Sequence, residues 1–390
     1  QTVNRKQALT EEIEYMQVVI AAERDLSTAM PAIQIFMSKY PGSMYNNRML
    51  ALMGSSHFVL HEYQDAIECF DECDPLLLDS KDCQRMVRHN AISLFRCGRA
   101  QEGYLQLSIL ARLVEEPDQD EDIVFYRAYY DYVSGRSADA RTGFENSLET
   151  RHDDEARLYL AEMSLNQGDG MTEAYNTAGE LVATTEDPYI EAEAERILGE
   201  YWYRKGEYAK AVDLLTSYMA IGQSQDVRHD TYLLGISEFQ TGDMDGAIEH
   251  LTRVVADDDA VTQNALLHIG LARLKKGDKN NARLAFERAS NIPGRPDVRE
   301  QALYNYAMVI HETSYSPFAE SVTSMERFLN EYPKSTYADR VSSYLVDVYL
   351  NTTSYDAALA SIAKIQNPGA SILAAKMQLL YKKAMDDLAA

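Results

Sequence analysis

A small residue recurs along this chain at intervals of 33 to 39 residues, and this spacing limits the possible folds more than any other feature. The column consists of Gly54, Ala91, Ala128, Ala161, Gly199, Gly235, Gly270 and Ala307, and Val346 continues it. Self-similarity at a period of roughly 20–50 residues is typical of stacked repeats. Each unit of such an array buries its apolar face only against its neighbours.

Three more columns keep register with the first. Seven residues after it lie the predicted turns, at His61, Gly98, Gly135, Gly168, Gly206, Gly242, Gly277, Ser314 and Thr353. Twelve residues after it lies a second small residue, at Ala66, Gly103, Ala140, Ala211, Ala247, Ala282, Ala319 and Ala358, with Ala174 displaced by one. Sixteen residues after it lies an apolar residue, at Phe70, Leu107, Phe144, Leu215, Leu251, Phe286 and Ile362.

The segment 197–218 shows what one unit folds into. Apolar residues within 197–202 fall on one stripe of a helix, and Gly206 then ends that helix because glycine adopts the left-handed cap conformation. A second amphipathic stripe follows, so the unit is predicted to be an antiparallel helical hairpin. Gly199 inside the first helix suggests that the second helix passes close by, at Ala211.

The sequence therefore predicts an all-α protein, a solenoid of about ten antiparallel helical hairpins in one continuous array over residues 1–390. The predicted hairpins span residues 10–41, 47–75, 84–117, 121–150, 154–188, 192–221, 228–258, 263–293, 300–333 and 339–367. One amphipathic helix over 370–388 follows them. It is either a cap on the last apolar face or part of a longer array.

Charge narrows the choice of partners. The chain has 37 basic and 61 acidic residues, a formal net charge of −24, so it repels phosphate backbones and anionic lipid. We expect no nucleic-acid binding and no direct insertion into a membrane. Partners with basic segments complement this charge.

Chemistry-bearing motifs are sparse. His57 and His61 are four residues apart beside Glu62, a spacing that can present two metal ligands, but we interpret them as surface or groove histidines. No phosphate-binding glycine loop or nucleophile elbow occurs. We therefore predict no catalytic residue, no metal, no cofactor and no enzymatic activity.

The four cysteines, Cys69, Cys73, Cys83 and Cys97, do not match the spacing of a zinc site. They are interpreted as small buried helix residues, and a disulfide or a metal remains the alternative.

These columns resemble the tetratricopeptide repeat, best in Leu198–Ala211, Leu234–Ala247 and Ile269–Ala282. The resemblance covers nearly the whole chain. It implies a right-handed superhelix whose first helices line a concave groove that binds peptides or proteins. One branch of the family clamps acidic chaperone tails, but the required pattern is missing here, since Ile92 follows Arg88 and Glu200 follows Arg196.

A narrower resemblance lies in the joins between hairpins. The segment 328–338, with Tyr332-Pro333-Lys334-Ser335-Thr336-Tyr337, has an internal twin in 36–45. Such joins look like those of bacterial envelope members of the superfamily, the outer-membrane assembly lipoproteins and the coordinator proteins of the peptidoglycan-associated system. The resemblance implies a periplasmic or outer-membrane-associated protein, with a cytoplasmic location as the alternative.

The candidate binding residues lie four positions after the small residue, where the family presents side chains to the groove. The aromatic members are Phe58, Phe95, Tyr132, Tyr203 and Phe239. They either hold a partner's side chains or pack between adjacent first helices. Polar contacts to the partner are predicted from Arg88, Arg96, Arg196 and Arg204.

Two functions remain open at this point. The leading hypothesis is a non-enzymatic scaffold that binds a protein or peptide partner, in a bacterial cell envelope. The alternative is a glycan-binding or outer-membrane assembly component on the same fold, for which Trp202 is the one tryptophan available to stack on a sugar.

Overall fold

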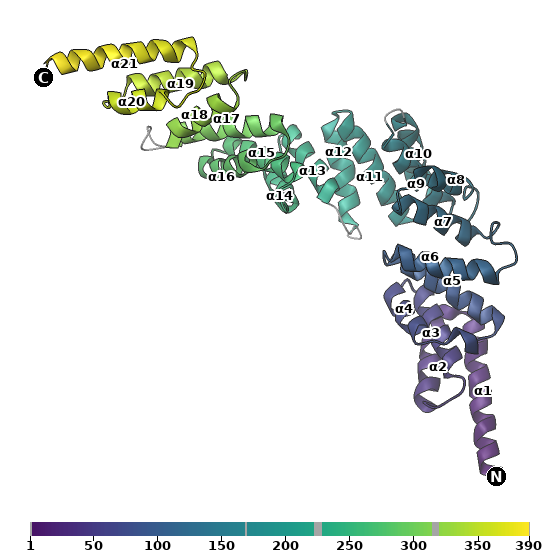
Figure 1. Cartoon of the computed structure of the whole chain (residues 1–390). Coiled ribbons are helices and arrows are strands. Elements are labelled where there is room, and N and C mark those ends of the chain that lie inside the picture. Colours follow the sequence, from purple (N-terminus) through teal and green to yellow (C-terminus); the bar gives the residue numbers. More distant parts are fainter. Residues whose placement is uncertain (1, 168–169, 222–227, 314–319, 390) are drawn as a thin grey trace. The chain divides into compact units, whose positions relative to one another are not determined.

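The computed structural model describes residues 2–167, 170–221, 228–313 and 320–389, and in these residues all regular structure is helical. The all-α prediction is confirmed. The helices gather into two compact units, Gln1–Glu191 and Ala192–Ala390 (Figure 1). The single array over the whole chain and its right-handed superhelix stay predictions. No described helix combines the length and apolar character that a bilayer span requires.

The first unit is a series of antiparallel hairpins in which an odd-numbered helix precedes its even-numbered partner. Its helices are α1 (Thr2–Arg24), α2 (Leu26–Lys39), α3 (Asn46–Val59), α4 (Tyr63–Asp71), α5 (Ser80–Arg96), α6 (Ala100–Leu113), α7 (Glu121–Val133), α8 (Ser137–Glu145), α9 (Asp153–Leu165) and α10 (Met171–Thr184). A short 3-10 helix, Pro75–Leu77, joins α4 to α5.

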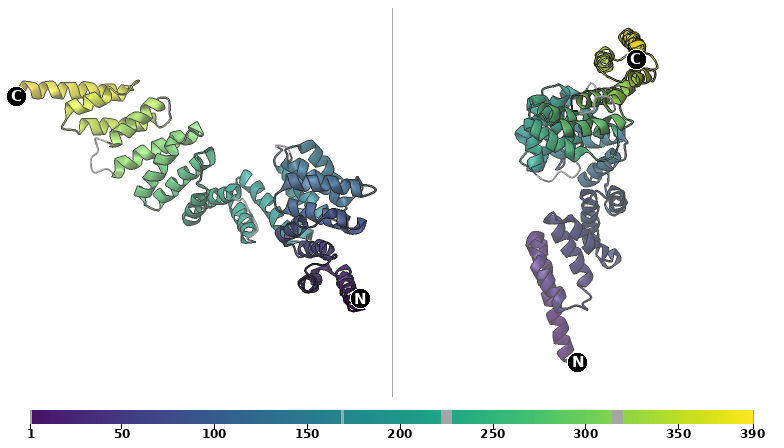
Figure 2. Two further views of the ribbon diagram at one scale, coloured as in Figure 1. Left: turned by 60° about the horizontal axis from the view of Figure 1, so that its bottom comes forward. Right: turned by 90° about the vertical axis from the view of Figure 1, so that its left-hand side faces the viewer.

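The second unit repeats the hairpin and ends on one long helix, drawn yellow at the C-terminus (Figure 2). Its helices are α11 (Pro188–Arg204, whose first residues belong to the first unit), α12 (Tyr208–Ala220), α13 (Arg228–Thr241), α14 (Met244–Val254), α15 (Ala260–Lys275), α16 (Lys279–Asn291), α17 (Pro296–Thr313), α18 (Glu320–Glu331), α19 (Ala338–Leu350), α20 (Tyr355–Ile362) and α21 (Ala370–Ala389). The predicted turn residues Gly168 and Ser314, and the small residue Ala319, lie outside the described residues.

The two helices of a hairpin interlock through the first and last columns of the repeat. A Cβ atom added at Gly54 would lie 2.5 Å from the Phe70 ring, and one added at Gly270 would lie 2.5 Å from the Phe286 ring. Both rings are buried. At Gly199 the close neighbour is Leu215, 2.8 Å from the added atom, so the predicted close approach is confirmed but its assignment to Ala211 was wrong. At these positions the space left by the small residue is filled by the large side chain sixteen positions later.

The turn column sets the geometry of each hairpin. Gly98 and Gly206 adopt φ values of 74° and 77°, the left-handed region that glycine enters without a Cβ penalty. The N–H of Gly98 donates to the carbonyl of Phe95 at 3.0 Å, and the next N–H donates to Leu94 at 2.8 Å. These paired bonds satisfy the last carbonyls of the first helix. His61 takes the same place with φ of 61°, a conformation that costs a residue with a side chain more than it costs glycine.

The twin joins found in the sequence share one geometry. The hydroxyl of Ser43 accepts the Tyr45 N–H at 3.1 Å, and the hydroxyl of Ser335 accepts the Tyr337 N–H at 3.0 Å. Each second tyrosine then stacks on a tyrosine of the preceding first helix. The ring centroids of Tyr45 and Tyr15 are 3.9 Å apart, and those of Tyr337 and Tyr304 are 4.2 Å apart. The motif therefore docks one hairpin onto the next.

Two of the four cysteines match their interpretation as buried helix residues. Cys69 and Cys73 are buried, and burial raises the pKa of each thiol to about 11, which keeps it protonated at neutral pH. Cys83 is half-buried and Cys97 is exposed, because Cys97 caps α5 just before the turn at Gly98. All four are free thiols.

The interlock can be tested by adding one methyl group. Gly54→Ala should lower the free energy of unfolding by about 1–3 kcal/mol, because the buried Phe70 ring must move. Gly179→Ala, in the interior of α10, is the matched control: a Cβ there meets nothing within 4 Å, so the change should stabilise by about 0.5–1 kcal/mol. Urea unfolding of both variants measures the difference. Equal effects would show that the small column is not a packing requirement.

Candidate functional site

The predicted aromatic column joins consecutive first helices. Phe58 of α3 stacks on His89 of α5, with centroids 4.1 Å apart. Phe239 of α13 meets His268 of α15 edge to face at 5.1 Å. In each case the partner lies two residues before the small residue of the next unit. The column therefore connects neighbouring repeats, which is the packing alternative drawn from the sequence.

The exposure of the same rings decides which of them a partner can reach. Phe95 is 3% exposed and Phe239 is 9% exposed, so both belong to the core. Phe58, Tyr132 and Tyr203 are half-buried and keep part of each ring at the surface. Partner binding by this column stays a prediction, and only the half-buried members offer a free edge for it.

Aromatic side chains gather most densely on the faces of α5, α7 and α9. Phe95 stacks on Tyr126 at 5.1 Å and meets Tyr129 edge to face at 5.8 Å. Tyr159 lies 5.5 Å from Tyr129 and 5.4 Å from Tyr132. We call Tyr126, Tyr129, Tyr132 and Tyr159 the tyrosine cluster. Tyr126 is buried, whereas the other three are half-buried.

An ionic network crosses the same three helices and begins at Arg88. Its guanidinium forms two bonds to Asp120, at 2.7 and 2.8 Å, and a third to Asp122 at 2.6 Å. Asp120 is also the N-cap of α7 and accepts the Ile123 N–H. Although burial opposes it, hydrogen bonding to Arg88 lowers the pKa of Asp120. The arginine thus fastens α5 to the first turn of α7.

The network continues to α9 through His152. Its Nε2 lies 2.9 Å from Asp122 and its Nδ1 lies 3.1 Å from Glu155. Burial opposes protonation of this ring, but the hydrogen bonds to the two carboxylates prevail and raise the pKa of His152. Glu155 also pairs with Arg96, so an arginine of α5 reaches across to α9. The predicted residues Arg88 and Arg96 thus join α5 to α7 and to α9.

The predicted residues of the second unit form smaller groups. Arg196 pairs with Glu193 at 2.8 Å, and the Nε of Arg204 donates to Glu200 at 3.0 Å. Burial opposes ionisation of Glu200, but hydrogen bonds to His229 and the charge of Arg204 lower its pKa to about 2. All four predicted arginines are therefore paired with carboxylates, and a partner that uses them must contact ion pairs instead of isolated cations.

Sequence reasoning missed much of this surface. It did not single out Tyr126, Tyr129, Tyr159, His152 or Glu155. A signal for part of the set was present, because the position two before the small residue is an aromatic ring in several units. These residues are His89, Tyr126, Tyr159, His268 and Tyr344.

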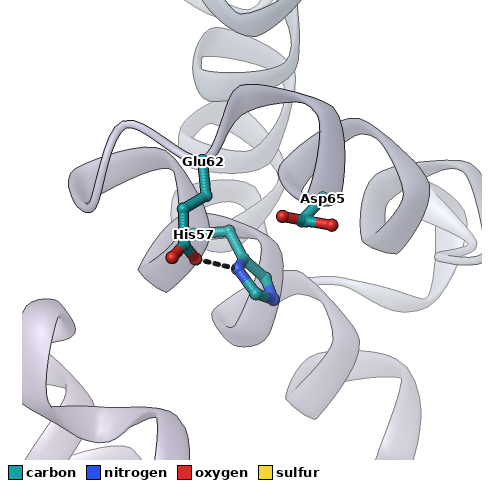
Figure 3. Close-up of side chains that lie close together, drawn as sticks. All are labelled: His57, Glu62 and Asp65. Carbon is teal, nitrogen blue, oxygen red and sulfur yellow. Dashed lines mark hydrogen bonds and ion pairs between the residues drawn. The ribbon is translucent and has the colours of Figure 1, made fainter.

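One cluster could hold a metal ion (Figure 3). His57, Glu62 and Asp65 offer ligand atoms within 4.8 Å of one another, and the His57 Nδ1 lies 2.6 Å from Glu62. His61, which the sequence had paired with His57, instead lies 2.8 Å from the Tyr63 hydroxyl. Both carboxylates of the cluster are exposed. The expectation of no metal stays a prediction.

The sugar-stacking alternative finds no support at Trp202. The ammonium group of Lys210 lies 3.8 Å from the centroid of its ring, so one face of the indole is already occupied by a cation.

Comparisons with known proteins agree with the repeat. A family model described as tetratricopeptide repeat matches residues 232–296, which include α14 and α15. Residues 232–296 are therefore similar to tetratricopeptide repeats. The same sequence columns continue on both sides of this segment. No curated protein matches the chain.

Solved structures show distant likenesses. A tetratricopeptide repeat protein from Parabacteroides merdae is 14% identical, over 75% of this chain and 98% of that one, with a TM-score of 0.30. The C-terminal part of a repeat-containing protein from Cytophaga hutchinsonii is 14% identical, over 64% and 97%, with a TM-score of 0.35. The human IFIT1 dimer is 12% identical, over 92% and 87%, with a TM-score of 0.40. At these values no partner can be carried over to this chain.

The ionic network predicts a pH dependence that passes through His152. Because the folded-state pKa of His152 is raised, its contribution to stability is present below the unfolded-state pKa near 6.5 and is lost as pH rises through the higher folded value. Compared with His152→Gln, the wild type should lose its stability advantage as pH rises above the unfolded-state pKa near 6.5. Urea-unfolding midpoints of both chains across a pH series test this. A difference independent of pH would contradict the assigned charge state.

Proposed function

We propose that the chain is a non-enzymatic scaffold that binds a protein or peptide on the shared face of α5, α7 and α9. We call this the α5–α9 face, made by the tyrosine cluster with Arg88, Arg96 and Glu155. The observation that carries the proposal is the concentration of half-buried tyrosines there, on units whose sequence columns continue those of the segment 232–296 that is similar to tetratricopeptide repeats. Neighbouring rings and ion pairs hold these side chains in place.

Tyrosines held in this way suit a recognition surface. Tyr129 and Tyr132 are restrained by contacts with Tyr159, so these side chains lose little conformational entropy when a partner binds. A phenol ring offers apolar area and a hydroxyl that can donate or accept, which is why tyrosine is enriched among residues that dominate binding energy. The partner expected here presents apolar side chains flanked by polar groups.

Charge supports a partner with basic segments. The net charge of −24 attracts a cationic chain over a range set by ionic strength, and this steers association more than it adds affinity. The paired arginines of the α5–α9 face do not oppose such a partner, because carboxylates neutralise them locally.

Replacing two half-buried rings tests the face. The double variant Tyr129→Ala, Tyr132→Ala should retain at most about one thirtieth of the wild-type affinity for the partner, a loss of roughly 2 kcal/mol. The control is Tyr175→Ala, a tyrosine 37% exposed on the second helix α10. Affinity capture from the source organism identifies the partner, and titration with the purified partner gives the three dissociation constants. Full affinity in the double variant, with circular dichroism unchanged, would refute the assignment.

The Tyr129/Tyr132 pair separates binding from folding better than the pair Tyr203/Phe239. Phe239 is 9% exposed and its ring lies 4.4 Å from the ammonium of Lys275, so its removal would also damage the core.

Salt provides an independent check on the partner's charge. The association rate should fall steeply as ionic strength rises, whereas the dissociation rate should change little. Stopped-flow or surface-binding kinetics at low and high salt measure both rates. An association rate insensitive to salt would exclude a basic partner.

We also propose that the protein works in a bacterial cell envelope, in the periplasm or at the outer membrane. The support is the paired Tyr-Pro-x-Ser-x-Tyr joins, whose serine and tyrosine contacts repeat at both ends of the chain. Fractionation of the source cells should place the protein with periplasmic or envelope markers. Recovery with cytoplasmic markers alone would overturn this location and leave the scaffold proposal standing.

A further inference from the structure

The join between α4 and α5 exposes two adjacent leucines. Leu76 is 90% exposed and Leu77 is 70% exposed, both in the short 3-10 helix that follows Asp74. The neighbouring join between α2 and α3 adds Met44, which is 84% exposed. Asn47 links the two joins, because its side-chain amide donates to the Asp74 carbonyl at 2.9 Å and its side-chain oxygen accepts the Asp74 N–H at 2.7 Å. Exposed apolar side chains are normal where they are scattered singly, whereas a group of them indicates an interaction site.

An ordered turn presents the two leucines at the surface. Pro75 fixes the first φ angle of the turn, and the Leu76 N–H donates to the Asp74 side chain at 2.9 Å. The Leu77 N–H donates to the Asp74 carbonyl at 3.2 Å. Leu78 donates its N–H to the Pro75 carbonyl at 3.3 Å and packs, half-buried, against the apolar core of the first unit. Side chains on a turn anchored in this way need little further ordering when a partner binds.

The leucines lie within a strongly acidic segment of the chain. Residues 62–80 contain seven acidic residues and no lysine or arginine. The four acids that flank the leucines are all exposed, namely Asp71, Glu72, Asp74 and Asp79. We call these four acids, together with Leu76 and Leu77, the acidic leucine patch. It joins apolar area to a concentrated negative charge.

Neither part of the patch helps the chain to fold. Asp71 is the last residue of α4 and Glu72 is its C-cap. Negative charge at that end interacts unfavourably with the helix dipole, and no basic residue lies in the last turn of α4 to offset it. Leucines that stay in water contribute no hydrophobic stabilisation. The acids and the leucines are therefore better explained by binding than by folding.

We propose that the acidic leucine patch docks into an apolar pocket with a basic rim on another protein. The leucines fill the pocket, and the lysines or arginines around it face the four carboxylates, which speeds association. The same charge disfavours two other occupants. A second copy of this chain would bring two acidic patches together, and an anionic lipid surface would repel the patch. The patch shares no residue with the α5–α9 face, so docking there does not depend on the function proposed above.

Cross-linking identifies what contacts the patch. The full chain with Leu76→benzoylphenylalanine, and a control chain with Leu105→benzoylphenylalanine, are irradiated in the source cells. Leu105 is 57% exposed on α6, a helix with one acidic and one basic residue. We expect another protein to be cross-linked from position 76 and not from position 105. Cross-links only to a second copy, to the same chain or to lipid, or none beyond the control, would overturn the proposal.

Vesicle flotation separates a protein pocket from a lipid surface. The purified full chain is mixed with vesicles of phosphatidylcholine, and separately with vesicles that also contain phosphatidylglycerol. We expect the chain to stay at the bottom of the gradient with both, because the carboxylates around the leucines remain hydrated. Flotation of the wild type that is lost in the double variant Leu76→Gln, Leu77→Gln would assign the patch to a membrane and overturn the proposal.

Titration with the purified cross-linked protein tests both parts of the patch. The double variant Leu76→Gln, Leu77→Gln should weaken binding about tenfold or more, whereas Leu105→Gln should leave the dissociation constant unchanged. The double variant Asp71→Asn, Glu72→Gln should associate more slowly and with less dependence on salt. It should be at least as stable to urea as the wild type, because it removes negative charge from the end of α4. Full affinity in the leucine variant, or an association rate unchanged in the charge variant, would overturn the proposal.

Discussion

The contact between a small residue on one helix and a large apolar residue on the next is the constraint on which the rest of the structure depends. Gly54 receives the Phe70 ring and Gly270 receives the Phe286 ring, with no room for a methyl group. This approach sets the distance between the helices of a hairpin. Only when that distance is fixed can the next hairpin find the apolar stripe it must cover.

A second layer of contacts then joins the hairpins to one another. Arg88 bonds to the N-cap aspartate of α7, as Arg228 bonds to Asp259, the N-cap of α15. Aromatic pairs such as Phe58 with His89 also join consecutive first helices. Where the two kinds of contact meet on α5, α7 and α9, they also create a surface whose rings are supported but not fully covered. The residues that join these hairpins are therefore also the residues of the proposed recognition surface.

The sequence predicted the fold well and the candidate site only in part, for a physical reason. The position of Gly206 follows from a local rule, because only the conformation of that turn decides it. The contact of Arg96 with Glu155 depends instead on how three first helices lie beside one another, and no local pattern contains this information. Phe95 and Tyr132 occupy equivalent columns, yet one is buried and the other half-buried, a difference that the column itself does not contain. Gly199 shows the same limit: the close approach was predictable, but its contact residue was not.

The left-handed turns also determine where the length of this protein can change. Within a unit the spacings of seven, twelve and sixteen residues are nearly constant, whereas the interval between units varies from 33 to 39. An extra residue in a hairpin turn would rotate the second helix by about 100° and point its large side chain away from the small residue that receives it. An extra residue in the join between hairpins has no such effect. We therefore expect insertions in the joins between hairpins, where they lengthen a loop without changing the packing of the two helices within a hairpin.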